Sequence, residues 1–381
     1  MEREELAGWL RLALTPGVGD GTARRLLAAF GLPDAVFAQS QAALTQVCSA
    51  AQAKALGVLP ADFDAALSRT WQWLREADGA PMARAIVTLG DAAYPGDLLQ
   101  TADPPLMLYV MGRPHQALAE LAGHAIAIVG SRNPTPQGAV DARLFARSLA
   151  GSGLTVVSGL ALGVDGAAHD GALDGAAPDM ALATVAVVGT GLDRVYPARH
   201  RELAHRIAQR GLIVSEFPLG TPPLNQNFPK RNRLIAAMSR GTLVVEAALA
   251  SGSLITARLA VEQGKEVFAI PGSIHSPQSR GCHALIRQGA KLVESVQDIF
   301  EELNPGAALP DGAAAIATDD DDDAEPQGLL AQMGHDPVSL DALGARTGKG
   351  AAELQVELLE LELDGQVARL PGGLFQRMAR G

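Results

Sequence analysis

The sequence predicts an α/β protein whose centre is a doubly wound, mainly parallel sheet, with a helical domain before it and a small helix-and-hairpin domain after it. Three observations predict this fold. Helical patterns fill the first 80 residues, apolar strands then alternate with helices, and three helical patterns and a hairpin end the chain. A length of 381 residues suits two or three domains. We expect a helical domain over 1–80, the sheet domain over 81–303, an acidic linker over 304–326 and a final domain over 327–381.

The first 80 residues contain short amphipathic helices. The segments EELAGWLRLAL and GTARRLLAAFG flank a turn that contains Gly17, Val18 and Gly19. Two helices joined by a Gly-x-Gly turn form the helix-hairpin-helix pattern, in which backbone N–H groups can receive a phosphate. An ordinary turn in a small SAM-like helical domain fits these residues equally well.

Apolar, β-branched runs recur from about residue 81. They are Ala85–Leu89, Ala125–Val129, Thr155–Val157, Thr184–Val188, Leu212–Val214, Thr242–Val245 and Glu266–Ile270. Segments with helical spacing lie between several of them, namely Ala139–Leu149, Arg199–Gln209 and Ser253–Gln263. Continuous apolar strands that alternate with helices indicate a parallel sheet covered on both faces. The sequence therefore predicts a Rossmann-like domain.

The last part of the chain begins with an acidic linker. Its run Asp319–Asp323 is a block of like charges, which repel one another and remain solvated. The following residues predict three helices and a hairpin that turns at Pro371, Gly372 and Gly373, an order typical of a winged helix. The helix in the recognition position, Ala351–Leu363, carries four glutamates and no lysine or arginine. Such a surface repels phosphates and favours a protein partner over DNA.

Composition narrows the class of protein. The chain has only two cysteines, and its first residues are acidic where a signal peptide needs basic ones. We therefore expect a cytoplasmic protein, and no apolar run is long enough to predict a membrane span. The net charge is −11, yet residues 126–300 hold 17 lysines and arginines against 13 acidic residues. Because local fields steer binding, the overall charge does not exclude a nucleic-acid partner.

Two predicted strands end in segments suited to binding an anion. Gly130 permits a sharp turn, Ser131 offers a hydroxyl, and Arg132 offers a guanidinium fork that matches phosphate. Ser158 and Gly159 follow the next strand, and glycine there allows a ligand close to the backbone. The carboxyl ends of strands are where open α/β sheets bind ligands. The alternative is an ordinary capped turn between strand and helix.

The most informative segment runs from Phe228 to Arg233. Lys230, Arg231 and Arg233 gather around Asn232 at a predicted helix start. Cations at a helix N-terminus oppose its dipole, and a sequence that tolerates such a conflict commonly has an anion there. Phe228 could stack on a base. A solvated basic face is the alternative.

The sequence predicts no catalytic residue, no cofactor and no metal ion. Asp165 and His169 are spaced i, i+4, which suits an acid–base or metal pair, but no third ligand or nucleophile accompanies them. We interpret them as a structural pair. No Walker loop, HExxH or serine–histidine–acid order is present, and GxGxxG does not follow the first long strand.

Several motifs in this order resemble the DNA-processing protein DprA (Smf) family. They are Gly130-Ser131-Arg132, the segment 158–169, Gly191-Leu192-Asp193 with Tyr196-Pro197, Phe228-Pro229 with Arg231-Asn232-Arg233, Glu246-Ala247, Ser251–Ala257, Pro271-Gly272-Ser273 and the segment 281–290. The resemblance implies a single-stranded DNA-binding protein of natural transformation. Such a protein protects incoming DNA, loads the RecA recombinase onto it and forms a homodimer through the Rossmann-like domain.

The resemblance also assigns the site. It implies that Arg132, Lys230, Arg231 and Arg233 line a phosphate pocket, with Ser131, Ser158, Gly159 and Asn232 beside them. One alternative is a nucleotide-processing hydrolase of the phosphoribohydrolase-like Rossmann type, whose Gly-Thr-x-x-Glu pattern is only partly matched by Gly241–Glu246. Another is a winged-helix transcription regulator, which would need to bind duplex DNA through an acidic helix.

Overall fold

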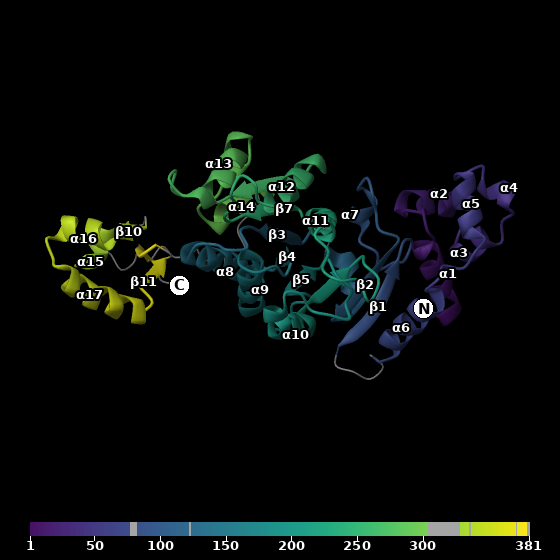
Figure 1. Ribbon diagram of the computed structural model, residues 1–381, viewed down its shortest axis with the longest axis horizontal. Helices are drawn as coiled ribbons and strands as arrows, with labels where there is room; N and C mark the ends of the chain where they lie inside the picture. Colours follow the sequence, from purple (N-terminus) through teal and green to yellow (C-terminus); the bar gives the residue numbers. More distant parts are fainter. Residues whose placement is uncertain (77–81, 122, 304–327, 335–336, 371, 379–381) are drawn as a thin grey trace.

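The computed structural model describes residues 1–76, 82–121, 123–303, 328–334, 337–370 and 372–378. Helices come first in the chain, a large sheet with helices on both faces follows, and a small helical segment with a hairpin comes last (Figure 1). The predicted acidic linker, 304–326, lies outside the described residues. No helix among those described is long and apolar enough to cross a membrane.

The N-terminal segment consists of six helices. They are α1 (Arg3–Leu14), α2 (Asp20–Phe30), α3 (Pro33–Phe37), α4 (Gln41–Leu44), α5 (Ala50–Leu56) and α6 (Phe63–Arg75). Leu6, Leu10 and Leu26 are almost fully buried between them. Trp73 of α6 lies edge-on to Tyr109 of the sheet, with 6.2 Å between ring centroids. The buried side chains of this segment and of one face of the sheet thus form a single core.

The central sheet has nine strands in the order β1-β2-β6-β5-β4-β3-β7-β8-β9. Their bounds are β1 (Ala83–Thr88), β2 (Met107–Gly112), β3 (Ala125–Val129), β4 (Thr155–Ser158), β5 (Thr184–Val187), β6 (Leu212–Ser215), β7 (Gly241–Val244), β8 (Glu266–Ala269) and β9 (Lys291–Leu292). The strands from β6 to β9 in this order are parallel, whereas β1 and β2 add an antiparallel edge. The chain runs outward from β3 to β6 and then returns to the other side of β3. This reversal is the topological switch point of a doubly wound fold.

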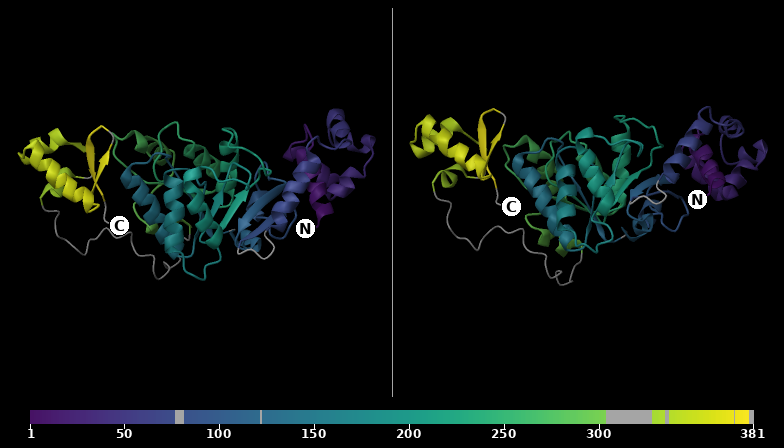
Figure 2. Two further views of the ribbon diagram at one scale, coloured as in Figure 1. Left: turned by 60° about the horizontal axis from the view of Figure 1, so that its bottom comes forward. Right: turned by 90° about the horizontal axis from the view of Figure 1, so that it is seen from below.

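Helices cover both faces of the sheet (Figure 2). On one face pack α8 (Pro136–Gly151), α9 (Val164–Gly175), α10 (Arg201–Arg210) and α14 (Val296–Leu303); on the other pack α11 (Asn227–Ala237), α12 (Ser253–Glu262) and α13 (Arg280–Arg287). Successive residues of a strand point to opposite faces. Ile126 and Ile128 of β3 therefore join the first core, and Ala125, Ala127 and Val129 join the second.

The structure confirms the predicted α/β fold and corrects it at the edges. Each of the seven apolar runs overlaps an observed strand. Strand β2 and the two-residue β9 were not predicted from the sequence, and neither was the direction of β2, which runs antiparallel to both of its neighbours, β1 and β6. Residues 107–112 read MLYVMG, which are apolar throughout because β2 is covered on both faces.

The C-terminal segment is a small winged helix. It contains α15 (Leu329–Met333), β10 (Val338–Ser339), α16 (Leu340–Thr347), α17 (Ala351–Leu363), β11 (Val367–Leu370) and β12 (Leu374–Arg377). The three strands form one sheet in the order β10-β12-β11. Gly372 and Gly373 have positive φ angles of 87° and 72°, as a tight turn between β11 and β12 requires. The predicted hairpin is therefore present, with Pro371 of its turn outside the described residues.

Candidate nucleic-acid interface

The predicted site residues lie at the carboxyl ends of β3 and β4 and at the start of α11. Three loops leave this edge of the sheet, and α11 begins beside them as the chain crosses from β6 to β7. Open α/β sheets bind their ligands at this edge, near the switch point. The parallel sheet thus brings together site segments that are about 100 residues apart in sequence.

Arg132 and two aromatic rings form a platform at this edge. The guanidinium carbon of Arg132 lies 5.4 Å from the ring centroid of Phe228, within the range of a cation–π contact. The ring of Tyr196, which is 48% exposed, lies 5.7 Å from that of Phe228 with a tilt of 34°. Arg132 is exposed and Phe228 is partly exposed. We call these three residues the Arg132 platform.

Arg231 lies beneath the surface. It is 4% exposed, and its guanidinium donates a hydrogen bond to the carbonyl of Val187 at the end of β5. A Cβ at Gly159 would lie 2.6 Å from the guanidinium carbon, so only glycine leaves room for this side chain. Burial lowers the pKa of Arg231 to about 10; Asp165 opposes this shift and Arg132 adds to it. Arg231 therefore supports the ends of β4 and β5 from inside.

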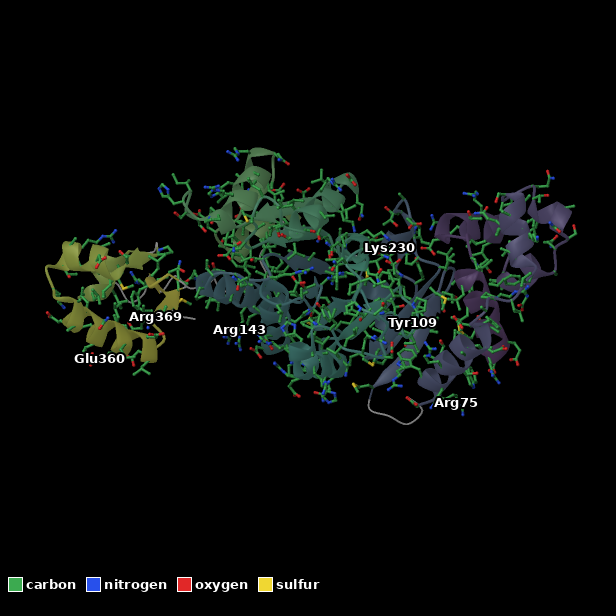
Figure 3. The ribbon with its side chains drawn as sticks, viewed as in Figure 1. Arg75, Tyr109, Arg143, Lys230, Glu360 and Arg369 are labelled. Atoms are coloured by element: carbon green, nitrogen blue, oxygen red, sulfur yellow. The ribbon has the colours of Figure 1, made fainter. Side chains whose placement is uncertain are left out.

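Lys230 and Arg233 are paired with acidic groups. Arg233 forms an ion pair with Glu216, whose side chain is 3% exposed. Lys230, which is labelled in Figure 3, has its Nζ atom 3.4 Å from one acidic oxygen and 3.5 Å from another. The first is Glu216 Oε2 and the second is Asp20 Oδ2 of α2. Burial raises the pKa of Glu216, while Arg233 and Lys230 lower it. Of these two cations Lys230 is the accessible one, because its side chain is 44% exposed and that of Arg233 only 12%.

The start of α8 is occupied by a carboxylate from the same chain. Glu246, after β7, accepts hydrogen bonds from the backbone N–H of Thr135 at 2.9 Å and from its hydroxyl at 2.5 Å. The Thr135 hydroxyl in turn accepts from the N–H of Gly138 at 3.0 Å. Burial raises the pKa of Glu246, and both bonds from Thr135 lower it. The backbone N–H groups of Thr135 and Gly138 are thus already hydrogen-bonded within the chain.

The remaining predicted residues shape the edge of the sheet. Ser158 is fully buried and donates its hydroxyl hydrogen to the carbonyl of Ile128 at 2.6 Å. The hydroxyl of Ser131 accepts from the N–H of Asn133 at 3.1 Å and is 9% exposed. A Cβ on Gly130 would lie 2.7 Å from the side chain of Val164. The side-chain amide of Asn232 donates to the carbonyl of Gly252 at 3.3 Å.

Asp165 and His169 do not form the pair that their spacing suggested. The Asp165 carboxylate accepts from the N–H of Ala161 at 3.2 Å, whereas His169 Nδ1 lies 2.7 Å from the hydroxyl of Thr184. Burial lowers the pKa of His169 to about 3, and the charges of His200 and Arg231 act in the same direction. Both side chains are therefore structural, but each is bonded to a different element. Within the described ranges, no three histidine, cysteine or acidic side chains are grouped to hold a metal ion.

Three residues of this site were not predicted from the sequence. Tyr196 lies in a loop that carries no distinctive signal alone, and Glu216 and Asp20 are single acids far from the basic segment in sequence. For Tyr196 the sequence offered one signal, because the Tyr196-Pro197 pair is one of the motifs by which the chain resembles a known family. Pairing of Glu216 and Asp20 with Lys230 is a property of the assembled fold.

These features define the class of the protein: a doubly wound α/β protein with a winged helix and a cation–aromatic platform at the carboxyl edge of its sheet. The model of the family "DNA recombination-mediator protein A" matches residues 85–304, and the model of the DprA winged helix domain matches residues 313–373. The chain therefore belongs to the DprA (Smf) family.

Named relatives agree with this assignment. The chain is 46% identical to Protein Smf of Escherichia coli over 292 residues, which cover 75% of each chain. It is similar to the X-ray structure of DNA processing protein A from Streptococcus pneumoniae, with 34% identity and a TM-score of 0.64 over 79% of this chain and 98% of that one. A second similar structure is DNA processing protein A from Helicobacter pylori, with 32% identity and a TM-score of 0.50 over 58% of this chain and 95% of that one. The description of that structure names a single-stranded DNA binding mode.

Proposed function

We propose that this protein binds single-stranded DNA at the carboxyl edge of its central sheet, as part of natural transformation. The observation that carries the proposal is the Arg132 platform, in which an exposed cation lies over one aromatic ring and a second ring packs against the first. Unpaired bases stack on aromatic rings while cations hold the adjacent phosphates. A duplex hides the faces of its bases, so this arrangement favours a single strand.

The residues of the edge fall into two groups under this proposal. Arg132, Tyr196, Phe228 and Lys230 are accessible and contact the strand. A second set keeps the edge in shape from below; its members are Gly130, Ser131, Ser158, Gly159, Arg231, Asn232 and Arg233. This division rests on exposure and on the hydrogen bonds that each side chain already makes.

The proposed activity involves no covalent chemistry. The rival hydrolase needs a free carboxylate and an open phosphate site, but here Glu246 fills the start of α8 and is bonded to Thr135. Incubation of the protein with nucleoside monophosphates, followed by chromatography for a released base, tests this directly. Release of base at a rate that Glu246→Gln abolishes would establish the hydrolase instead.

Fluorescence anisotropy with a labelled oligo-dT strand tests the binding site. We expect Arg132→Ala to weaken binding by about tenfold, because a hydrogen bond to a charged group contributes about 1.5–3 kcal/mol and 1.4 kcal/mol is a factor of ten. The slope of log K against log salt should also fall by about 0.7, the value for one phosphate contact on a single strand. The same sequence as a duplex should bind more weakly to the parent protein.

Arg369 supplies a matched control. Its guanidinium carbon lies 5.8 Å from the ring centroid of Phe375, so it is also a cation over a phenylalanine, but on β11 of the winged helix. Arg369→Ala should leave single-strand binding within about twofold of the parent, as expected for a residue outside the contact. Equal losses in the two variants, or tighter binding of the duplex, would contradict the proposed site.

The resemblance to DprA proteins extends the proposal to partners. We propose domains over 1–80, 81–303 and 327–381, with a homodimer formed through residues 81–303. We also propose that this cytoplasmic protein loads the RecA recombinase onto the strand it protects. Sedimentation velocity measures the first property, dimer formation. RecA loading is measured by a strand-exchange assay on single-stranded DNA that is pre-coated with a competing binding protein. If the protein does not stimulate RecA in this assay, loading is excluded.

A further inference from the structure

Helix α17 of the winged helix has two apolar faces. Leu354 and Leu358 point into the small core and are at most 1% exposed. Val356, Leu359 and Leu363 are 59%, 56% and 78% exposed. Their spacing of i, i+3 and i+7 places them along one line of the helix, about opposite to the buried leucines. We call these three residues the α17 stripe.

Exposure of such a stripe is unusual on a helix of this kind. A helix at the surface of a globular protein normally has one apolar face toward the core and a polar face toward water. Large exposed apolar patches that are bordered by polar groups mark interaction sites. Apolar residues at i, i+3 and i+7 are also the pattern by which one helix packs against another.

Acidic residues border the stripe on both sides. At about 100° per residue, Glu360 and Glu353 lie on one flank and Glu362 lies on the other. Glu353 Oε1 is also 3.9 Å from the Nζ atom of Lys349, whose closer ion pair is with Glu357. Glu360 and Glu362 are exposed, and the described residues offer them no ion pair; Glu360 points outward from α17 (Figure 3). The border therefore carries a net negative charge.

This charge selects among possible occupants of the stripe. Duplex DNA and anionic lipid are both repelled by carboxylates on the contact face. A second copy of α17 would bring its own glutamates against these, and like charges across an interface disfavour association. A helix with apolar residues along one side and lysine or arginine at the borders matches both the shape and the charge.

We propose that α17 is a docking site for a cationic amphipathic helix of another protein, with the α17 stripe as the apolar contact and Glu360 and Glu362 as charged borders. The helix that in other winged helices enters the DNA major groove serves here as a protein-binding surface. This inference does not depend on the proposed single-strand site, which lies on the central sheet.

The test uses the full chain and a designed peptide labelled with fluorescein. A peptide of about 18 residues is long enough to form a helix; it carries leucine along one side and lysine on both flanks. Two comparison peptides replace the leucines by serine or the lysines by glutamate. Anisotropy should show saturable binding of the first peptide and at least tenfold weaker binding of the other two. The serine peptide also measures any purely electrostatic attraction to other acidic parts of the chain.

Two variants locate the contact. Leu359→Gln with Leu363→Gln should weaken the leucine–lysine peptide about tenfold, which corresponds to 1.4 kcal/mol, and Glu360→Lys with Glu362→Lys should do the same. Both pairs are exposed, so the melting temperature should stay unchanged. The control is Val58→Gln, which alters a side chain that is 62% exposed in the N-terminal segment.

Each other outcome overturns the proposal. Unchanged peptide binding in the leucine variant places the contact elsewhere, and equal binding of the glutamate peptide removes the role of charge. If the leucine variant instead changes the sedimentation coefficient of the free protein, a second copy covers the stripe. If it abolishes binding to vesicles containing phosphatidylserine, the stripe is a membrane contact. Single-stranded DNA binding should be the same in the parent and both variants.

Discussion

Glu216 holds two cations of the candidate site, and its removal should act on stability and on DNA binding in opposite directions. Glu216→Gln keeps the size of the side chain but removes the charge that Arg233 and Lys230 share. Arg233 is then a cation with a 12% exposed side chain and no other ion-pair partner among the described residues. Lys230, which is 44% exposed, remains solvated.

The expected cost in stability follows from this burial. Breaking a buried ion pair by removing one partner costs about 3–5 kcal/mol because an uncompensated charge stays buried. Of the two ion pairs of Glu216, only the one with Arg233 is buried. We therefore expect the free energy of unfolding to fall by the lower end of this range, about 3 kcal/mol, in urea unfolding at pH 7 followed by circular dichroism. Replacing the whole pair, Glu216→Leu with Arg233→Met, should cost far less, because apolar residues of similar volume commonly replace a buried pair at little cost.

The same variant should bind single-stranded DNA at least as well as the parent. Lys230 is released from Glu216 and becomes more available to a phosphate, which we expect to strengthen binding about two- to fivefold at low salt, the value of a partly exposed ion pair. Glu262→Gln is the control, because Glu262 lies 3.5 Å from Arg258 in an exposed pair and its loss should cost less than 1 kcal/mol. A stability loss below 0.5 kcal/mol in Glu216→Gln, or DNA binding as weak as in Arg132→Ala, would refute this reasoning.

Three further predictions concern the same edge of the sheet. Asp20→Asn removes the second acid beside Lys230 and should tighten single-strand binding by about twofold at low salt, with the gain lost at high salt in anisotropy titrations. Gly159→Ala forces a Cβ against Arg231 and should cost about 1–3 kcal/mol in urea unfolding, the usual cost of overpacking; a neutral result would show that Arg231 can move. Burial raises the pKa of Asp141 to about 6 from 3.8, while the bond from Gln137 lowers it. The folded state therefore holds this proton more tightly than the unfolded chain, so the contribution of Asp141 to stability is greatest below about pH 4 and is lost as the pH rises through 6. Asp141→Asn should be insensitive to that step, and parallel stability–pH curves for the two proteins would contradict the shift.

Much of the architecture follows from patterns that are local in the sequence. Each predicted apolar run overlaps a strand, because a strand covered on both faces has to be apolar at nearly every position. The placement of Arg132 and Lys230 at one edge could also be predicted, since all parallel strands end on the same side of a sheet. The antiparallel strand β2 escaped prediction because its residues, MLYVMG, read equally well as part of a buried helix.

What the sequence determined by itself is most of the helices and strands and the edge of the sheet near which the cations lie, since both depend on spacing along the chain. Only the tertiary structure decided which charges are available. Arg231 is buried because the ends of β4 and β5 close around it, and Glu246 reaches Thr135 across 111 residues to fill the start of α8. Arg132, Phe228 and Tyr196 likewise become one platform through contacts between distant loops. Burial and pairing of charges depend on such long-range contacts, and no local pattern of residue types encodes them.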